Sequence, residues 1–274
     1  MSEADAVALS TRGPVTRDWL RRDLAALGIQ SGAVLMVQAS LSKLGWIIGG
    51  APTVVAALRD IVGNSGTLVM PTFCSSNTEP GNWRAPPVPE SWWPIIRAEM
   101  PGFDPATTPS RIMGAIPEYF RTLPEIHRSA HPAQSWAAQG PLAAQITAAH
   151  SLDCGNGDNT PLGRCYELSR HVLCLATKRT TALHLADYRS EWPGKYARRS
   201  GSATMSGGVR QWTEYENHWS DGEDFEQIRL DFIASHPPGT GTWQEGPVAY
   251  STSRLFAIRP LIDFAVKWME EHRR

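Results

Sequence analysis

The chain lacks the features that mark several functional classes. It has only four cysteines in 274 residues, and none of them stands in a Cys-x-x-Cys pair or at the spacing of zinc ligands. We therefore expect reduced thiols, no disulfide framework and no metal site. No segment approaches the roughly 18 consecutive apolar residues of a membrane span, and the polar N-terminus has no apolar signal-peptide core. These absences predict a cytoplasmic protein without a membrane partner.

An excess of either charge is also missing, because 26 basic and 27 acidic residues are interspersed and leave a net charge of −1. Without a basic stripe to neutralise phosphates, nucleic acid is not an expected partner. The chain contains neither the GxxxxGK[ST] loop of P-loop proteins nor the GxGxxG turn of dinucleotide-binding proteins, and it has no GxSxG nucleophile elbow. A function must therefore be sought in other motifs.

Helix and strand signals alternate through much of the chain. The short apolar runs predict buried strands at 33–40, 66–72, 171–177 and 246–258, and apolar residues at helical spacing predict helices at 15–29, 50–63, 224–235 and 259–273. The first strand runs are continuous rather than alternating, which is typical of a sheet covered on both faces. The segment 197–217 has the pattern of a hairpin around a Ser-Gly-Gly turn. We predict a single α/β domain over residues 1–274, with a mixed, largely parallel central sheet covered by helices and a β-rich C-terminal lobe.

The segment 73–108 is rich in proline, tryptophan and polar residues and is too long for a simple connection. Such an excursion is typical of a lid or of the wall of a ligand site. Most of the 11 tryptophans are expected to pack in the ordinary way, but Trp83 in this segment is a candidate for a ligand contact.

One stretch, TTALHLADYRSEW (Thr180 to Trp192), combines an imidazole and a carboxylate in an otherwise apolar helix opening. At helical spacing Thr181, His184 and Asp187 are successive neighbours, which would suit a relay of hydroxyl, imidazole and carboxylate. A structural role is the alternative, because histidines in helices are commonly satisfied by local partners. His131, which precedes a proline in SAHPAQSW, is a second candidate because a rigid turn can hold its side chain at a site.

A second stretch, SLSKLGWIIGG (Ser40 to Gly50), follows the first expected strand directly. Ligands of α/β proteins usually bind where strands of the sheet end. The hydroxyls, backbone amides and paired glycines of this loop would let a thin ligand approach the chain closely.

Eight blocks occur in one order: SLSKLGWIIGG, GTLVMPTF, PPVPESWW, TPSRIMGAIPEYFRTLP, RSAHPAQSWAAQG, TPLGRCYEL, TALHLAD and RPLIDFAVKWMEE. Together they resemble the aminoglycoside 3-N-acetyltransferases, over roughly residues 14–271. The resemblance implies transfer of acetyl from acetyl-coenzyme A to the 3-amino group of a 2-deoxystreptamine antibiotic, without a metal. The expected partners are therefore an aminoglycoside and acetyl-coenzyme A, in a protein that is a monomer or a homodimer.

The resemblance also implies the residues of two binding sites. The donor would contact Ser40, Leu41, Ser42, Lys43, Leu44, Ile48, Gly49, Gly50, Ser110, Arg111, Met113 and Thr160. A polycationic acceptor should meet acidic side chains, for which the candidates are Asp221, Glu223, Asp224 and Glu226, together with Trp83. Acidic residues at a helix start are also favourable through the helix dipole alone, so their presence has a structural explanation as well.

The chemistry needs a base, because an amine must be neutral to attack a thioester. Histidine titrates near neutral pH, and a neighbouring carboxylate would orient it and stabilise the imidazolium, which assigns these roles to His184 and Asp187. Thr181 or the backbone amides of the Ser40 loop would then stabilise the thioester oxyanion.

The chain departs from the family pattern near this site. It has QASLS where members usually have HSSLS, Asp187 where they commonly have Glu, and a shorter loop, ATKRTT, before the histidine. Three functions therefore stay open: an aminoglycoside acetyltransferase, a biosynthetic or self-protection acyltransferase with another amine or acyl thioester, and a catalytically impaired binding protein.

Overall fold

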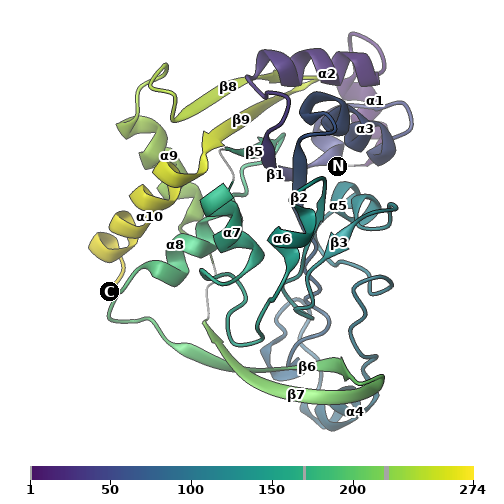
Figure 1. Cartoon of the computed structure of the whole chain (residues 1–274), viewed down its shortest axis with the longest axis vertical. Coiled ribbons are helices and arrows are strands. Elements are labelled where there is room, and N and C mark those ends of the chain that lie inside the picture. Colours follow the sequence, from purple (N-terminus) through teal and green to yellow (C-terminus); the bar gives the residue numbers. More distant parts are fainter. Residues whose placement is uncertain (1, 169–170, 219–221) are drawn as a thin grey trace.

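A computed structural model describes residues 2–168, 171–218 and 222–274. Its centre is a seven-stranded sheet in the order β3-β4-β2-β1-β5-β9-β8 (Figure 1). The strands are β1 (Val34–Ala39), β2 (Thr67–Pro71), β3 (His127–Arg128), β4 (Trp136–Gln139), β5 (His171–Leu175), β8 (Trp243–Val248) and β9 (Ser251–Ala257). β1 runs parallel to β2 and β5, and the other pairs are antiparallel. The predicted mixed α/β fold is confirmed, with its parallel part confined to the three central strands.

Helices cover both faces of this sheet. The α-helices of the described residues are α1 (Glu3–Leu9), α2 (Arg17–Ala26), α3 (Ala51–Val62), α4 (Trp93–Glu99), α5 (Ala115–Phe120), α6 (Ala143–Thr147), α7 (Pro161–Leu168), α8 (Leu183–Arg189), α9 (Phe225–Ser235) and α10 (Ile258–His272). Of these, α4 lies away from the central sheet (Figure 1). Because side chains alternate along a strand, Leu35 and Val37 of β1 pack with α2, α3 and α5, whereas Met36 packs with α6 to α10. Burial on both faces explains the continuous apolar run of this strand.

The predicted hairpin forms a separate two-stranded sheet, β6 (Ala197–Ser206) with β7 (Val209–His218), turning at Gly207 and Gly208 with positive φ. It runs as a long ribbon along one side of the molecule, and its turn end lies beside α4, where Arg210 Nε donates to the Met100 carbonyl at 3.0 Å (Figure 1). The ribbon is tied to the segment 73–108 by Asn77, whose amide bonds the backbone N–H and C=O of Ala203 at 2.8 and 2.9 Å. That segment is therefore a structured wall rather than a free loop.

The C-terminal part differs from the sequence prediction in one element. The single strand expected at 246–258 is two antiparallel strands, β8 and β9, which turn at Ala249 with a φ of 54°. Both join the central sheet rather than the ribbon. The turn was missed because no glycine marks its left-handed position. No helix within the described ranges has the length and apolar character needed to cross a membrane.

Two buried histidines support the turn beside β4. His131 is fully buried; its Nδ1 accepts the backbone N–H groups of Ala133 and Gln134 at 3.1 Å, so Nε2 carries the proton and faces the Leu152 carbonyl. His150 lies against it, with ring centroids 4.8 Å apart, and bonds the Gly155 carbonyl through Nε2 at 2.8 Å. Burial lowers the pKa of His131 to about 4 and that of His150 to about 3. Both rings are therefore neutral structural groups.

This pair should make folding stability depend on pH. A histidine that is neutral when folded but has an ordinary pKa near 6.5 when unfolded destabilises the protein as pH falls below about 6.5, and the loss continues toward the folded pKa. We expect the free energy of unfolding to fall between pH 6.5 and 4.5 by more than about 1 kcal/mol for each buried histidine. Urea unfolding across this range measures the slope.

His150→Asn should reduce the dependence of the free energy of unfolding on pH by up to the equivalent of one bound proton. His127→Asn, which replaces an exposed histidine, should leave that dependence unchanged. Equal slopes for the two variants would show that the buried pair does not control acid stability.

Candidate active site

Two large cavities open near the ends of the central parallel strands. The Ser40 cavity, of about 700 Å³, is formed by the loop after β1, the start of α1, residues 112–115, Thr177 and Arg179. The His184 cavity, of about 560 Å³, is formed by parts of 73–88, residues 111–112 and 133–134, the open end of the ribbon, and α8. Ile112 lines both, so the two cavities meet at this residue. Its φ of 67° is rare for a β-branched side chain, which marks the junction as a constrained position.

Half of the residues predicted to bind the donor line the Ser40 cavity: Ser40, Leu41, Ser42, Lys43, Gly50 and Met113. Lys43 and Arg179 supply positive charge to its wall. Gly50 has a φ of 61° and is the residue before α3, a conformation that suits glycine. The cavity is thus lined by hydroxyls and by two cations against the one carboxylate of Glu3, a lining that suits a phosphate-bearing ligand.

The other predicted donor residues lie elsewhere. Leu44 is fully buried in the apolar core, and Ile48 and Gly49 are exposed outside the cavity wall. The Ser110 hydroxyl donates to Glu118 at 2.6 Å, while Arg111 lines the His184 cavity. Thr160 is fully buried and bonds the Gly157 carbonyl and the first amides of α7. Packing, a hydrogen bond to Glu118 and helix capping thus account for Leu44, Ser110 and Thr160, whereas Ile48, Gly49 and Arg111 lie outside the wall of the Ser40 cavity.

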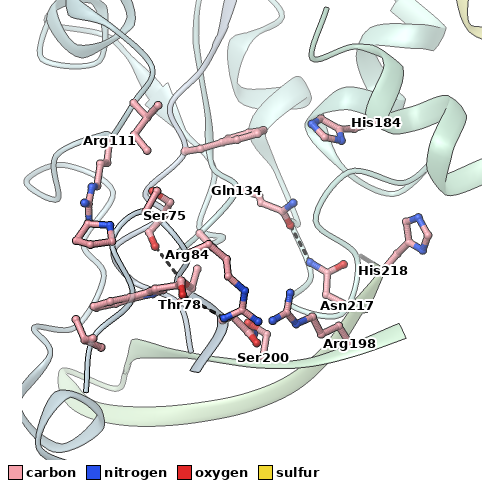
Figure 2. Close-up of a pocket in the computed structure, with 18 residues that line it drawn as sticks. Ser75, Thr78, Arg84, Arg111, Gln134, His184, Arg198, Ser200, Asn217 and His218 are labelled. Carbon is pink, nitrogen blue, oxygen red and sulfur yellow. Dashed lines mark hydrogen bonds between the residues drawn. The ribbon is translucent and has the colours of Figure 1, made fainter. Parts of the chain in front are cut away.

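The His184 cavity brings together residues from distant parts of the chain (Figure 2). Its polar lining includes Ser75, Thr78, Arg84, Arg111, Gln134, His184, Arg198, Ser200, Asn217 and His218. Phe73, Trp83, Pro86 and Val88 give it an apolar side. Trp83, predicted as a ligand contact, is therefore on the wall of this cavity.

His184 is held at the start of α8, with its ring edge against Phe225 at a centroid distance of 4.9 Å. Burial lowers the pKa of its imidazole to about 4, against an opposing effect of the nearby Asp187 carboxylate. The ring is therefore neutral at pH 7. Among the described residues, no group hydrogen-bonds this imidazole, so a lone pair is available to a ligand in the cavity.

Asp187 does not make the predicted hydrogen bond to His184. Its side chain is 1% exposed, and its carboxylate accepts from His218 Nε2 at 2.9 Å and from the Arg273 guanidinium. The i, i+3 spacing places the two side chains near each other, but His218 and Arg273 reach the carboxylate oxygens directly. His218 lines the cavity and was missed by the sequence, since it lies 31 residues from Asp187 without a motif of its own.

The other two catalytic candidates lie off the cavities. Thr181 is in the turn before α8, where its carbonyl accepts the His184 backbone N–H at 3.1 Å, and it lines neither cavity. His131 has both nitrogens occupied by backbone groups, so it has no free lone pair to act as a base. Its predicted catalytic role is replaced by a structural one.

Of the acidic residues predicted for the acceptor, the three in the described part of the chain, Glu223, Asp224 and Glu226, do not line the His184 cavity. Asp224 forms a two-pronged pair with Arg273 at 2.7 Å, and Glu226 pairs with Lys178 at 2.8 Å. Glu223 is exposed, and Asp221 lies outside the described residues. Asp224 and Glu226 thus have structural partners within the C-terminal helices and the loop before α8.

Comparison with known proteins identifies the family of the chain. The family model for aminoglycoside 3-N-acetyltransferase matches residues 36–270. Aminoglycoside N(3)-acetyltransferase VII of Streptomyces paromomycinus is 36% identical, covering 97% of this chain and 96% of its own. The crystal structure of the YokD protein from Bacillus subtilis is similar with a TM-score of 0.92 and 36% identity over 98% of both chains. A structure of AAC-IIIb with CoASH has a TM-score of 0.83 and 32% identity, covering 94% of this chain and 97% of that one. The chain therefore belongs to the aminoglycoside 3-N-acetyltransferase family.

Proposed function

We propose that the protein transfers an acetyl group directly from acetyl-coenzyme A to a primary amine, with His184 as the general base. The observation that carries the proposal is the junction at Ile112. There a basic, hydroxyl-lined cavity meets a second cavity that contains a neutral imidazole with no hydrogen-bond partner among the described residues. This arrangement supports a donor and an acceptor entering from different sides.

The donor assignment rests on the Ser40 cavity. Lys43 and Arg179 can pair with phosphates, and Ser40 and Ser42 can bond the amides of the pantetheine arm. The similar protein AAC-IIIb forms a binary complex with CoASH, which supports the same kind of donor here. The first amides of the short 3-10 helix Leu41–Lys43 have no partner within that helix and are candidates to bond the thioester oxygen.

The reaction needs one base and no covalent enzyme intermediate. The amine nitrogen attacks the thioester carbon, the C–N bond forms, and the C–S bond breaks. Nitrogen becomes cationic in the addition intermediate and is then acidic enough to give its proton to a neutral imidazole of low pKa. The imidazolium can return that proton to the departing thiolate, which leaves as the coenzyme A thiol.

His218 is the second candidate for the base. Its pairing with a buried carboxylate resembles the carboxylate–imidazole pair of hydrolases, and its ring also lines the cavity. We favour His184 because neither of its ring nitrogens is engaged within the described structure, whereas Asp187 already holds His218 Nε2. We assign His218 and Asp187 the role of holding the cavity wall next to His184 in place.

Family membership supports the 3-amino group of a 2-deoxystreptamine aminoglycoside as the reference acceptor. A resistance role and a biosynthetic or self-protection role would use the same base and donor and would differ in the amine that is accepted. The lining of the His184 cavity is therefore what distinguishes them.

Variants of the two histidines separate their roles. His184→Ala should lower kcat by at least about 100-fold and leave the affinity for acetyl-coenzyme A within a few-fold, because only proton transfer is lost. His218→Gln should cost about tenfold, since it acts through position alone. Steady-state kinetics and calorimetry measure both effects. If His218→Gln were the more damaging variant, the base would be His218.

Neighbouring cations test the donor site. Arg179→Ala should raise the KM for acetyl-coenzyme A by about tenfold, because it removes a charge from the Ser40 cavity. Lys178→Ala is the matched control, since Lys178 pairs with Glu226 and does not line the cavity. Equal KM values for the two variants would place the phosphates elsewhere.

A further inference from the structure

The His184 cavity has an unusual charge for a site that would take a polycation. Three guanidinium groups line it, from Arg84, Arg111 and Arg198, and no carboxylate does so among the described residues. An aminoglycoside carries several ammonium groups, which would meet like charges on this wall. The lining favours a ligand with negative charge.

Three carboxylates near this wall are already paired, and Glu216, which precedes the lining residue Asn217 on β7, is exposed and does not line the cavity. Glu79 accepts two bonds from Arg97, at 2.7 and 3.1 Å, and Glu214 pairs with Arg199. Asp187 is enclosed by His218 and Arg273. A cationic ligand could recruit Glu79, Glu214 or Asp187 only by breaking an existing ion pair.

The arginines are placed to receive an anion. Arg84 donates to the carbonyls of Gly81 and Trp83 at 3.1 and 3.2 Å, and neither Arg84 nor Arg111 has a carboxylate partner in the described part of the chain. Arg198 projects from β6 toward the same part of the cavity as Arg84, whereas His184 lies at another side (Figure 2). A guanidinium matches the two oxygens of a carboxylate or phosphate, and it binds such groups more strongly than neutral ones.

Resting on the proposed acetyl transfer at His184, we propose that the acceptor is a primary amine that also carries an anionic group, a carboxylate or a phosphate. The amine lies at His184 and the anion lies at Arg84 and Arg198. The cationic wall also favours the neutral form of the bound amine, which is the form that attacks. A cavity of about 560 Å³ with Phe73 and Trp83 on its apolar side has room for a sugar or a flat ring between the two ends.

The test measures thiol release from acetyl-coenzyme A by the full-length protein with matched amines. Three of the amines are amino sugars: glucosamine carries no anionic group, glucosamine 6-phosphate carries a phosphate, and muramic acid carries a carboxylate. Kanamycin is the polycationic amine. We expect kcat/KM for at least one anionic sugar to exceed that for glucosamine and for kanamycin by tenfold or more. The better of the two anionic sugars identifies the group that is recognised.

Neighbouring arginines on β6 provide the matched variants. Arg198→Gln should abolish the preference for the anionic sugar through a higher acceptor KM, with the KM for acetyl-coenzyme A within twofold of wild type. Arg199→Gln removes the same charge from an exposed residue that pairs with Glu214 and does not line the cavity, so it should retain the preference.

Three results would overturn the inference: equal kcat/KM for all three sugars, a higher value for kanamycin than for both anionic sugars, or an Arg198→Gln variant that keeps the preference but loses acetyl-coenzyme A affinity. The last would assign the arginine to the donor. Calorimetry distinguishes failure of this inference from failure of the proposed function. If no amine is acetylated, but an anionic sugar binds tenfold more tightly than glucosamine and this difference is lost in Arg198→Gln, the anion site is supported and the acetyl transfer is contradicted.

Discussion

The buried carboxylate of Asp187 is the interaction on which the site depends. It joins α8 to the end of the ribbon through His218 and to the C-terminus through Arg273, which also holds Asp224 at the start of α9. Burying an unpaired charge costs several kcal/mol, a large fraction of the stability of a whole domain, and His218 and Arg273 offset this cost by direct contact with the carboxylate. The same contacts bring the open end of β7 against α8. The His184 cavity exists because these segments, far apart in the sequence, are fixed to one acid.

That arrangement also sets the electrostatics around His184. Burial disfavours its charged form, and nearby His218 and Arg273 act in the same direction, while Asp187 opposes them. The net result is a neutral imidazole beside a wall that carries Arg84, Arg111 and Arg198. A neutral base in a positive cavity is suited to an amine that enters uncharged, and it is poorly suited to hold several ammonium groups at once.

The sequence predicted what depends on local pattern and left out what depends on long-range contacts. Apolar runs predicted the central strands, and the strand exit predicted a ligand site at the loop 40–50, because both follow from burial and from backbone geometry. Ser40 to Lys43 and Gly50 of this loop do line a cavity. The sequence spacing placed His184 and Asp187 one helical turn apart. It could not show that His218, at the end of β7, is the histidine that contacts the Asp187 carboxylate. Position within a motif likewise suggested Leu44 and Thr160 as ligand contacts, whereas the fold uses one as core and the other to cap α7. Charge alone suggested Asp224 and Glu226, whose partners Arg273 and Lys178 are known only from the folded chain.

The proposed acetyl transfer requires His184 to be a neutral base that faces the cavity of the acceptor. Nitrogen-15 NMR titration of histidine-labelled protein tests it most directly, with the His184 signals assigned by their loss in His184→Gln among the eight histidines of the chain. The account predicts a neutral imidazole across pH 6 to 8, with a pKa well below the usual 6.5 or so of histidine. A His184 signal that titrates with a pKa above about 7 would contradict it, because the ring would then be protonated and unable to accept the amine proton.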